Sequence, residues 1–460
     1  MTAARPNLYL MGEHEPVSRE LEATDLKVTG TLPPELNGAF LRASPNPQFP
    51  PEGRYHWFDG DGMVHGLRFR DGKASYVNKW IRTAGFEAER AAGKALWTGI
   101  MEPVKPNGLK DTANTDLVVH NGKLLALWWM CGTPYQLDPV TLVTIGPERF
   151  GGKLVRAMSA HAKVDPRTGE LVFFDYSIVR KPWMRYGVVS RTGELLRDEV
   201  IELPTPHIQH DIALTERFSI LMDLPLGWDQ ALLAQGKRRI GFDKSSPARF
   251  GIIPRLGTNA DVRWFEATSC YMYHTINAYE VGDEVVLVGC RVGDPIPKDQ
   301  RTDGKVARLE FIELVPHLYR WRFNLKTGAV HEEQLDDVAT EFPRVNDALA
   351  GTKVRYSYNP RVAPRPDLMF DGVLKYDLEQ KTSTKYDFAK GWYGSEAVFT
   401  ARPGATTEDD GWLVTCLTNA AEQRSIGIVL DAKHVEAGPI ATIELPQRIP
   451  VGFHTCWSPV

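Results

Sequence analysis

Four histidines, each expected at the edge of a strand or turn, are the residues in this chain that could most readily form a site together. Neutral imidazoles from four distant segments could converge on one metal ion. The alternative is that each is an ordinary polar side chain satisfied by hydrogen bonds, because the chain contains 12 histidines. The four candidates are His161, His210, His274 and His454.

Short-range metal signatures add nothing to this set. The sequence has no His-Glu-x-x-His motif and no paired Cys-x-x-Cys of the zinc type. His207 and His210 form an isolated His-x-x-His, but His207 follows a proline in a turn-like stretch. We therefore expect His207 to lie outside any metal site.

The elements that must position these histidines are short strands joined by tight turns. Thr-Gly steps lie within residues 164–174, 188–195 and 323–330, and each glycine can supply the positive φ that a tight hairpin needs. The same alternation of apolar residues around a turn predicts hairpins at residues 69–73, 120–123, 280–284 and 376–380.

Many hairpins over the whole length suggest a sandwich, a barrel or a propeller, and the length best fits an all-β propeller with blades of about four strands. Length alone would suggest two or three domains, but repeat architectures exceed that range and no change in composition marks a linker, so we expect one domain over residues 1–460. Helices are expected only near residues 86–96, 229–237 and 338–349, as insertions that roof a cavity on one face.

Composition excludes several classes of protein. A formal charge of −4 and a pI near 6.3 give no electrostatic attraction for nucleic acid. The N-terminus lacks the apolar core of a signal peptide, and no stretch is apolar enough to span a membrane, so a cytoplasmic location is expected. The five cysteines have apolar or aromatic neighbours and are expected to be buried thiols; a Cys nucleophile is an alternative that no other feature supports.

The sequence around each histidine resembles the carotenoid cleavage oxygenase family, in residues 159–166, 209–211, 273–280 and 452–457. Residues 86–90 and 261–267 further resemble its phenylpropanoid branch, the lignostilbene dioxygenases and isoeugenol monooxygenase. The resemblance implies a seven-bladed propeller that binds Fe(II) on its axis through the four histidines. Four imidazoles suit an octahedral Fe(II) with two positions left for O2 or water, whereas zinc would favour a closed tetrahedral site.

The family also uses glutamates that accept hydrogen bonds from the ligand imidazoles. The resemblance assigns this role to Glu341 and Glu396; the alternatives are a charge at a strand edge for Glu396 and a solvated acidic face with Asp336 and Asp337 for Glu341. The third glutamate of the family is missing, because residues 125–135 contain no carboxylate. One ligand histidine is therefore expected to lack a carboxylate partner.

The same resemblance identifies candidate substrate contacts. Residues 56–63 match the family loop beside the metal, and this resemblance implies that Phe58 is a substrate contact. The same residues do not form a calcium-binding loop of the EF-hand type, because Val64 and Arg70 stand where that loop needs glycine and glutamate. Stilbene-cleaving members hold a 4-hydroxyphenyl group with a Tyr and a Lys. Here Met101 or a neighbouring residue stands where the Tyr is expected, and Trp128 or Trp129 where the Lys is expected.

Two functions follow. The first is an Fe(II)-dependent oxygenase that uses O2 to cleave a carbon–carbon double bond of a small, apolar, conjugated substrate and gives aldehydes. An apocarotenoid or a non-phenolic aryl alkene is then as plausible a substrate as a stilbene. The second is a non-catalytic propeller that serves as a binding module, with a structural metal or none. Four histidines with Glu341 and Glu396 favour the enzyme, because a scaffold has no reason to gather them.

Overall fold

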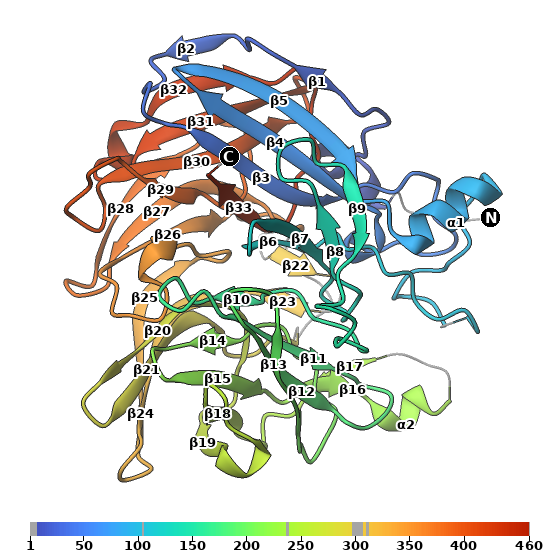
Figure 1. Cartoon of the computed structure of the whole chain (residues 1–460), viewed down its shortest axis with the longest axis vertical. Coiled ribbons are helices and arrows are strands. Elements are labelled where there is room, and N and C mark those ends of the chain that lie inside the picture. The colour runs from blue at the N-terminus through green and yellow to red at the C-terminus, as the bar shows by residue number, and fades with distance from the viewer. Residues whose placement is uncertain (1–6, 104, 236–238, 297–306, 310–311, 460) are drawn as a thin grey trace.

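The computed structural model describes residues 7–103, 105–235, 239–296, 307–309 and 312–459. These residues form seven antiparallel sheets, the blades of a β-propeller, and two additional short hairpins (Figure 1). The all-β seven-bladed propeller expected from the sequence is thus confirmed. Within the described residues, no helix is both long enough and apolar enough to cross a membrane.

The seven blades follow one another along the chain, and we number them in that order. Blade 1 contains β1 (Glu22–Ala23), β5 (Lys73–Trp80), β4 (Gly62–Arg70), β3 (Gly38–Pro45) and β33 (Thr455–Ser458). Blade 2 contains β6 (Asp116–His120), β7 (Lys123–Leu127), β8 (Tyr135–Leu137) and β9 (Thr144–Pro147). Blade 3 contains β10 (Lys163–Val164), β11 (Leu171–Tyr176), β12 (Met184–Val189) and β13 (Leu195–Ile201). Blade 4 contains β14 (Ala213–Leu214), β15 (Phe218–Asp223), β18 (Ala248–Pro254) and β19 (Arg263–Ala267).

Blade 5 contains β20 (Tyr271–Val281), β21 (Glu284–Val292), β24 (His317–Asn324) and β25 (Val330–Ala339). Blade 6 contains β26 (Tyr356–Val362), β27 (Phe370–Asp377) and β28 (Thr382–Asp387); residues 340–344 lie along β26 through bridges from Thr340 and Arg344. Blade 7 contains β29 (Val398–Ala401), β30 (Gly411–Asn419), β31 (Arg424–Asp431), β32 (Pro439–Glu444) and β2 (Val28–Gly30). The two extra hairpins pair β16 (Leu226–Trp228) with β17 (Ile240–Phe242), and β22 (Ala307–Leu309) with β23 (Ile312–Leu314).

Both ends of the chain close the ring. The C-terminal β33 pairs with β3 and becomes the innermost strand of blade 1, and the N-terminal β2 pairs with β32 at the outer edge of blade 7. In Figure 1 the blue strands of blade 1 accordingly lie beside the red strands of blade 7. The inner strands meet around the axis, where β33 contacts both β29 and β6, and β14 contacts β20.

Turn chemistry explains the hairpins, and all of those expected from the sequence are confirmed. Gly169, Gly193 and Gly328 have φ values of 72°, 86° and 82°, which a residue with a side chain rarely adopts. They connect β10 to β11, β12 to β13, and β24 to β25. The other four expected turns connect β4 to β5, β6 to β7, β20 to β21, and β27 to β28.

The helices agree less well with the sequence. Helix α1 (Ala84–Ala92) begins after the Thr83 cap and ends where Gly93 turns left-handed, rather than covering residues 86–96. Helix α2 covers only Gln230–Leu233, and residues 236 and 237 of that expectation lie outside the described part of the chain. The helix expected over 338–349 is wrong: these residues complete β25, pair with β26 and form only the 3-10 turn Asp347–Leu349 (η5), because Pro343 cannot lie in a helix interior.

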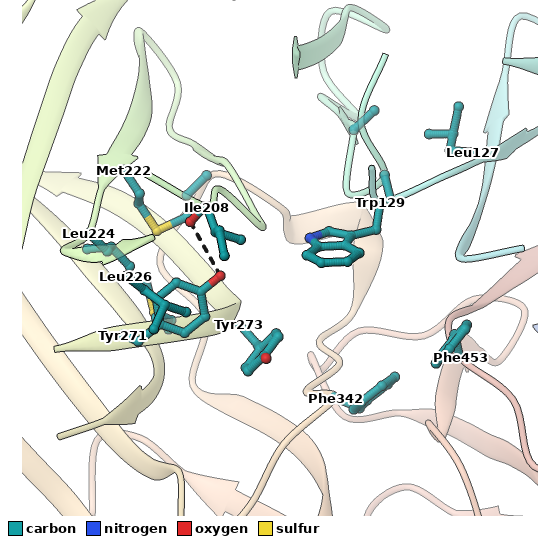
Figure 2. Packing of buried hydrophobic residues seen from close by; sticks show 14 of the residues in the cluster. Leu127, Trp129, Ile208, Met222, Leu224, Leu226, Tyr271, Tyr273, Phe342 and Phe453 are labelled. Atoms are coloured by element: carbon teal, nitrogen blue, oxygen red, sulfur yellow. Dashed lines mark hydrogen bonds between the residues drawn. The ribbon is translucent and has the colours of Figure 1, made fainter. Parts of the chain in front are cut away.

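The apolar faces of the blades pack against one another. Phe40 and Leu67 of blade 1 share one buried cluster with Val414 and Val429 of blade 7. Similar clusters lie between blades 1 and 2, 3 and 4, 5 and 6, and 6 and 7. A further large cluster, rich in aromatic residues, includes Trp129, Tyr273, Phe342 and Phe453 (Figure 2).

Candidate metal centre

The four histidines come together on the propeller axis. His161 lies two residues before β10, His210 lies three residues before β14, His274 lies in β20, and His454 directly precedes β33. Ligand nitrogens of His161, His210 and His274 lie within 4.8 Å of one another. The His454 ring centroid lies 4.5 Å from that of His161 and 4.6 Å from that of His274. Four blades therefore contribute one imidazole each to a single buried cluster.

The nitrogens that face the cluster are available for a ligand. The Nε2 atoms of His210 and His274 lie 3.2 Å apart, and the buried Nε2 of His161 has no hydrogen-bond partner among the described residues. Burial is the main cause that lowers the pKa values of His161, His210 and His274 well below the usual value, and repulsion by neighbouring histidines adds to it. These three imidazoles are neutral, which leaves a lone pair on each for a cation.

Two of the imidazoles have carboxylate partners. His454 Nδ1 donates to Glu396 Oε1 at 2.6 Å, and His274 Nδ1 donates to Glu341 Oε2. Each hydrogen bond places the proton on Nδ1 and so directs the Nε2 lone pair toward the cluster. Both carboxylates are buried, which does not agree with the solvated alternatives considered for them.

The two carboxylates differ in charge state. Burial alone would raise the pKa of Glu396, but His454 and Arg344 bring it to about 2. Burial raises the pKa of Glu341 to about 8 because no cationic side chain compensates it to the same extent. Burial lowers the pKa of His454, yet Glu396 outweighs that effect and the net direction is upward. A cation bound beside His274 would favour the ionised form of Glu341.

His210 has no carboxylate partner. Its buried Nδ1 has no hydrogen bond within the described chain, and the ring of Trp129 lies against it with 5.8 Å between centroids. The Trp129 indole N–H instead donates to the Gln209 carbonyl at 3.2 Å. The strand that lacks the family's third glutamate therefore supplies an aromatic wall to this histidine.

Two cavities adjoin the cluster from opposite sides. Residues that precede His274 and His454 line a small apolar cavity of about 20 Å³, and residues that follow them line a polar axial cavity of about 430 Å³. The apolar cavity is formed by Trp57, Phe58, Thr115, His210, Tyr273, His274, Leu314, Glu341, Phe342, Leu368, Phe453 and His454. In Figure 2 the rings of Trp129, Tyr273, Phe342 and Phe453 approach the same region from four segments.

Loops rather than α-helices roof the apolar cavity. Phe58 lies in the 3-10 turn η3 (Trp57–Asp59), which His56 caps by accepting the Phe58 N–H at 3.1 Å. Its ring lies 4.9 Å from Trp129 and 5.1 Å from Phe453. Leu314 enters from β23, and neither α1 nor α2 contributes a lining residue in the described structure.

The remaining candidates lie elsewhere. Trp128 points away from the cluster and lines a separate cavity with Tyr55, Asp61 and Lys110. Met101 belongs to the same buried aromatic cluster as Phe58 but is not among the residues that line the apolar cavity. His207 pairs with Asp223 at 2.6 Å and lies outside the histidine cluster, as expected. All five cysteines are free thiols, and Cys131 alone of them is only partly buried.

Sequence reasoning missed two groups of residues. Tyr273, Phe342 and Phe453 line the apolar cavity, and each is the sequence neighbour of a histidine or glutamate already singled out. Asp116 and Asp211 are buried beside the cluster, and both accept backbone hydrogen bonds from ligand segments. The His-Thr pair at 274–275 is the signal that could have pointed to Asp211, because Thr275 donates its hydroxyl to that carboxylate as Thr455 does to Glu396. No comparable sequence signal pointed to Asp116, which accepts the backbone N–H of His161.

Comparison with known proteins agrees with this geometry. The family model described as retinal pigment epithelial membrane protein, RPE65, matches residues 14–459. The chain is 38% identical to carotenoid 9,10(9',10')-cleavage dioxygenase 1 of Arabidopsis thaliana, over 98% of this chain and 90% of the relative. It is 31% identical to isoeugenol monooxygenase of Pseudomonas nitroreducens, over 99% and 98%. The crystal structure of Pseudomonas brassicacearum lignostilbene dioxygenase superposes with a TM-score of 0.89 at 31% identity, over 99% of both chains. The sequence and the fold are similar to those of these proteins along nearly the whole chain, and the chain therefore belongs to the carotenoid cleavage oxygenase family of enzymes.

Proposed function

We propose that this enzyme binds Fe(II) through His161, His210, His274 and His454 and uses O2 to cleave a double bond of an apolar conjugated substrate, giving aldehydes. The observation that carries the proposal is the convergence of four buried imidazoles, two of them bonded to buried carboxylates, at the inner end of an apolar cavity. The names of its relatives support the class of reaction.

The donor set fits a non-haem iron. Four imidazoles without a thiolate suit Fe(II), and the unpartnered, buried Nε2 of His161 would otherwise be costly to leave without a ligand. Bound Fe(II) would supply the activation of O2, a reaction that the protein's own side chains cannot perform.

The chain's own residues bind, orient and exclude water. Glu341 and Glu396 fix the tautomers of His274 and His454. Phe342 stacks on His454 with 4.6 Å between centroids, and Tyr273 lies edge-on to His210 at 4.5 Å. These rings keep the region next to the imidazoles apolar, so a double bond held there reacts away from bulk water.

The lining favours a neutral substrate. Among the described residues that form the apolar cavity there is no Lys or Arg to stabilise a phenolate, and Trp129 packs on Phe58 at its edge. Phe58, which lines the cavity, is therefore a proposed substrate contact. Trp129 does not itself line the cavity but is proposed as well, because its ring packs against both Phe58 and His210. Trp128, which lines a separate cavity, and Met101 are not proposed as contacts. A cavity of about 20 Å³ holds roughly one water, so an extended polyene or aryl alkene requires the lining rings to move apart on binding.

A propeller that only binds a ligand is the competing function. It would leave the pairing of Glu341 with His274 and of Glu396 with His454 without a purpose, because buried carboxylate–imidazole pairs are expensive to desolvate. We therefore favour the enzyme.

One experiment tests the proposal directly. The purified chain is loaded anaerobically with Fe(II), its iron content is measured, and O2 uptake and aldehyde formation are followed with an apocarotenal and an aryl alkene. We expect about one iron per chain and coupled uptake of O2, and loss of both in His161→Ala. His207→Ala is the matched control, because His207 lies outside the cluster. Full activity without iron, or in His161→Ala, would contradict the proposal.

A further inference from the structure

Carboxylates at the beginnings of three inner strands connect neighbouring blades beside the histidine cluster. Asp116 is the first residue of β6, and Asp211 and Glu396 each lie two residues before an inner strand. Asp116 Oδ2 accepts the His161 N–H at 2.9 Å, Asp211 Oδ2 accepts the Thr275 N–H at 2.8 Å, and Glu396 Oε2 accepts the Thr455 N–H at 2.6 Å. Every one of these N–H groups belongs to a ligand histidine or to the residue after it.

Two of the connections are the same in detail. Thr275 donates both its N–H and its hydroxyl to Asp211 Oδ2, each at 2.8 Å. Thr455 donates both groups to Glu396 Oε2, at 2.6 and 2.8 Å. The difference lies in the second oxygen: Glu396 reaches the imidazole of His454, whereas the shorter Asp211 accepts the Ile212 N–H at 2.7 Å and Lys163 Nζ at 2.8 Å.

The backbone at His274 needs such a partner. The ladder between β20 and β21 shifts register between Met272 and Thr275 and again between Thr275 and Asn277. A bulge of this kind redirects a side chain but leaves backbone groups without ladder partners. Asp211 accepts the Thr275 N–H at this irregular segment, from the neighbouring blade.

The backbone at His161 is also irregular. His161 has a φ of 66°, in the left-handed region that residues with a side chain seldom occupy. Asp116 is buried, and with its two oxygens it accepts the His161 N–H at 2.9 Å and its own neighbour's N–H, from Leu117, at 2.8 Å. Because strained conformations persist only when surrounding groups hold them, the carboxylate of Asp116 acts on the conformation of this histidine.

We propose that Asp116 and Asp211 are positioning residues that hold the backbone of His161 and His274 in the conformation from which both imidazoles reach the metal. The proposal rests on the metal centre proposed above. Neither aspartate touches an imidazole, so both act through the backbone. By contrast, Glu341 and Glu396 bond directly to ligand rings.

The test measures metal binding rather than turnover. Co(II) is titrated into metal-free protein, and its visible absorption, its affinity in competition with a chelator and the rise in melting temperature on binding are recorded. We expect Asp116→Asn, Asp211→Asn and Thr275→Val to weaken Co(II) binding by about 10–100-fold, the range typical of groups that orient ligands. The absorption bands should change, since they report the ligand geometry. The rise in melting temperature on binding should shrink with the affinity.

Matched controls separate positioning from stability. Asp165 is as buried as Asp211 but bonds to Arg167 and Arg255, and the Thr215 hydroxyl donates to Glu280. Asp165→Asn and Thr215→Val should lower the melting temperature equally with and without Co(II), and leave the affinity unchanged. Thr275→Val replaces the hydroxyl that donates to Asp211 with a methyl group and leaves the backbone N–H in place, so it keeps the test valid if an aspartate variant fails to fold.

The outcomes are distinct. Wild-type Co(II) affinity and spectra in all three variants would overturn the positioning role while leaving the metal centre intact. The positioning role would also be overturned if the three variants had a lower melting temperature but the same rise in melting temperature on Co(II) binding as the controls. Absence of Co(II) and Fe(II) binding in the wild type would refute the metal centre itself, and the positioning role with it.

Discussion

The indole of Trp129 lies against His210 with 5.8 Å between ring centroids, on the imidazole whose Nδ1 has no hydrogen bond in the described structure. His274 and His454 each bond to a glutamate through the same atom. The site therefore combines two imidazoles that carboxylates orient with one that an aromatic ring supports. This asymmetry places an aromatic ring, rather than a carboxylate, beside His210.

Replacing Trp129 tests that asymmetry. Trp129→Glu provides a carboxylate that can reach His210 Nδ1, and it should retain Fe(II) more strongly against a chelator than Trp129→Gln does. The two variants remove the same indole and create similar voids, so their difference reports the charge alone. The rate of iron loss from each, measured with a coloured chelator, checks the expectation; equal rates would show that His210 does not use a carboxylate.

The carboxylate partners should matter for iron rather than for folding. Glu396→Gln and Glu341→Gln are expected to weaken iron affinity or turnover by about 10–100-fold while the melting temperature of the metal-free protein changes little. Glu396 should have the larger effect, because its pKa of about 2 keeps it ionised at neutral pH. Iron titration and circular dichroism measure the two properties separately. Unchanged affinity and turnover in both variants would contradict a role in holding the imidazoles.

Substrate preference should follow from the uncharged lining. A 4-methoxystilbene and an apocarotenal are expected to be turned over faster than a 4-hydroxystilbene, because the described cavity lining contains no Lys or Arg to stabilise a phenolate. Parallel measurement of aldehyde formation from the three compounds checks this. A strict requirement for the free 4-hydroxyl would show the idea to be wrong.

The interaction of Asp367 with Arg365 should make stability depend on pH. Asp367 is buried; although burial raises its pKa, His14 and Arg365 lower it to about 2, compared with 3.8 in an unfolded chain. Since the pKa of Asp367 is lower in the folded protein than in the unfolded chain, ionised Asp367 stabilises the fold. This stabilisation is present above the unfolded pKa, near pH 4, and is lost as the pH falls toward 2. The difference between the two pKa values corresponds to about 2 kcal/mol in the free energy of unfolding. The melting temperature of Asp367→Asn should fall below that of the wild type at pH 7, and the gap should narrow between pH 4 and 2. A gap independent of pH would contradict the assignment.

Local chemistry is what the sequence by itself determined. Gly169, Gly193 and Gly328 occupy turns that require a positive φ, so the hairpins could be predicted from neighbouring residues alone. The short strings around the four histidines carried the resemblance to the carotenoid cleavage oxygenase family, and that resemblance, rather than the histidines alone, identified the candidate ligands. The helix expected over 338–349 failed because its apolar spacing ignored Pro343 and the pairing of Thr340 and Arg344 with β26.

Long-range contacts were decided only by the tertiary structure. The pairing of β33 with β3 joins residues separated by almost the whole chain and brings His454 to the axis. Of two adjacent tryptophans, Trp129 lies against His210 and Trp128 lines another cavity. Both follow β7 at a turn closed by the hydrogen bond from the Cys131 N–H to the Trp128 carbonyl, so only the folded backbone decides which ring meets the histidine. Asp116 and Asp211 act on His161 and on the residue after His274 from neighbouring blades. A carboxylate 45 or 64 positions away becomes a hydrogen-bond partner only when the blades have packed around their axis.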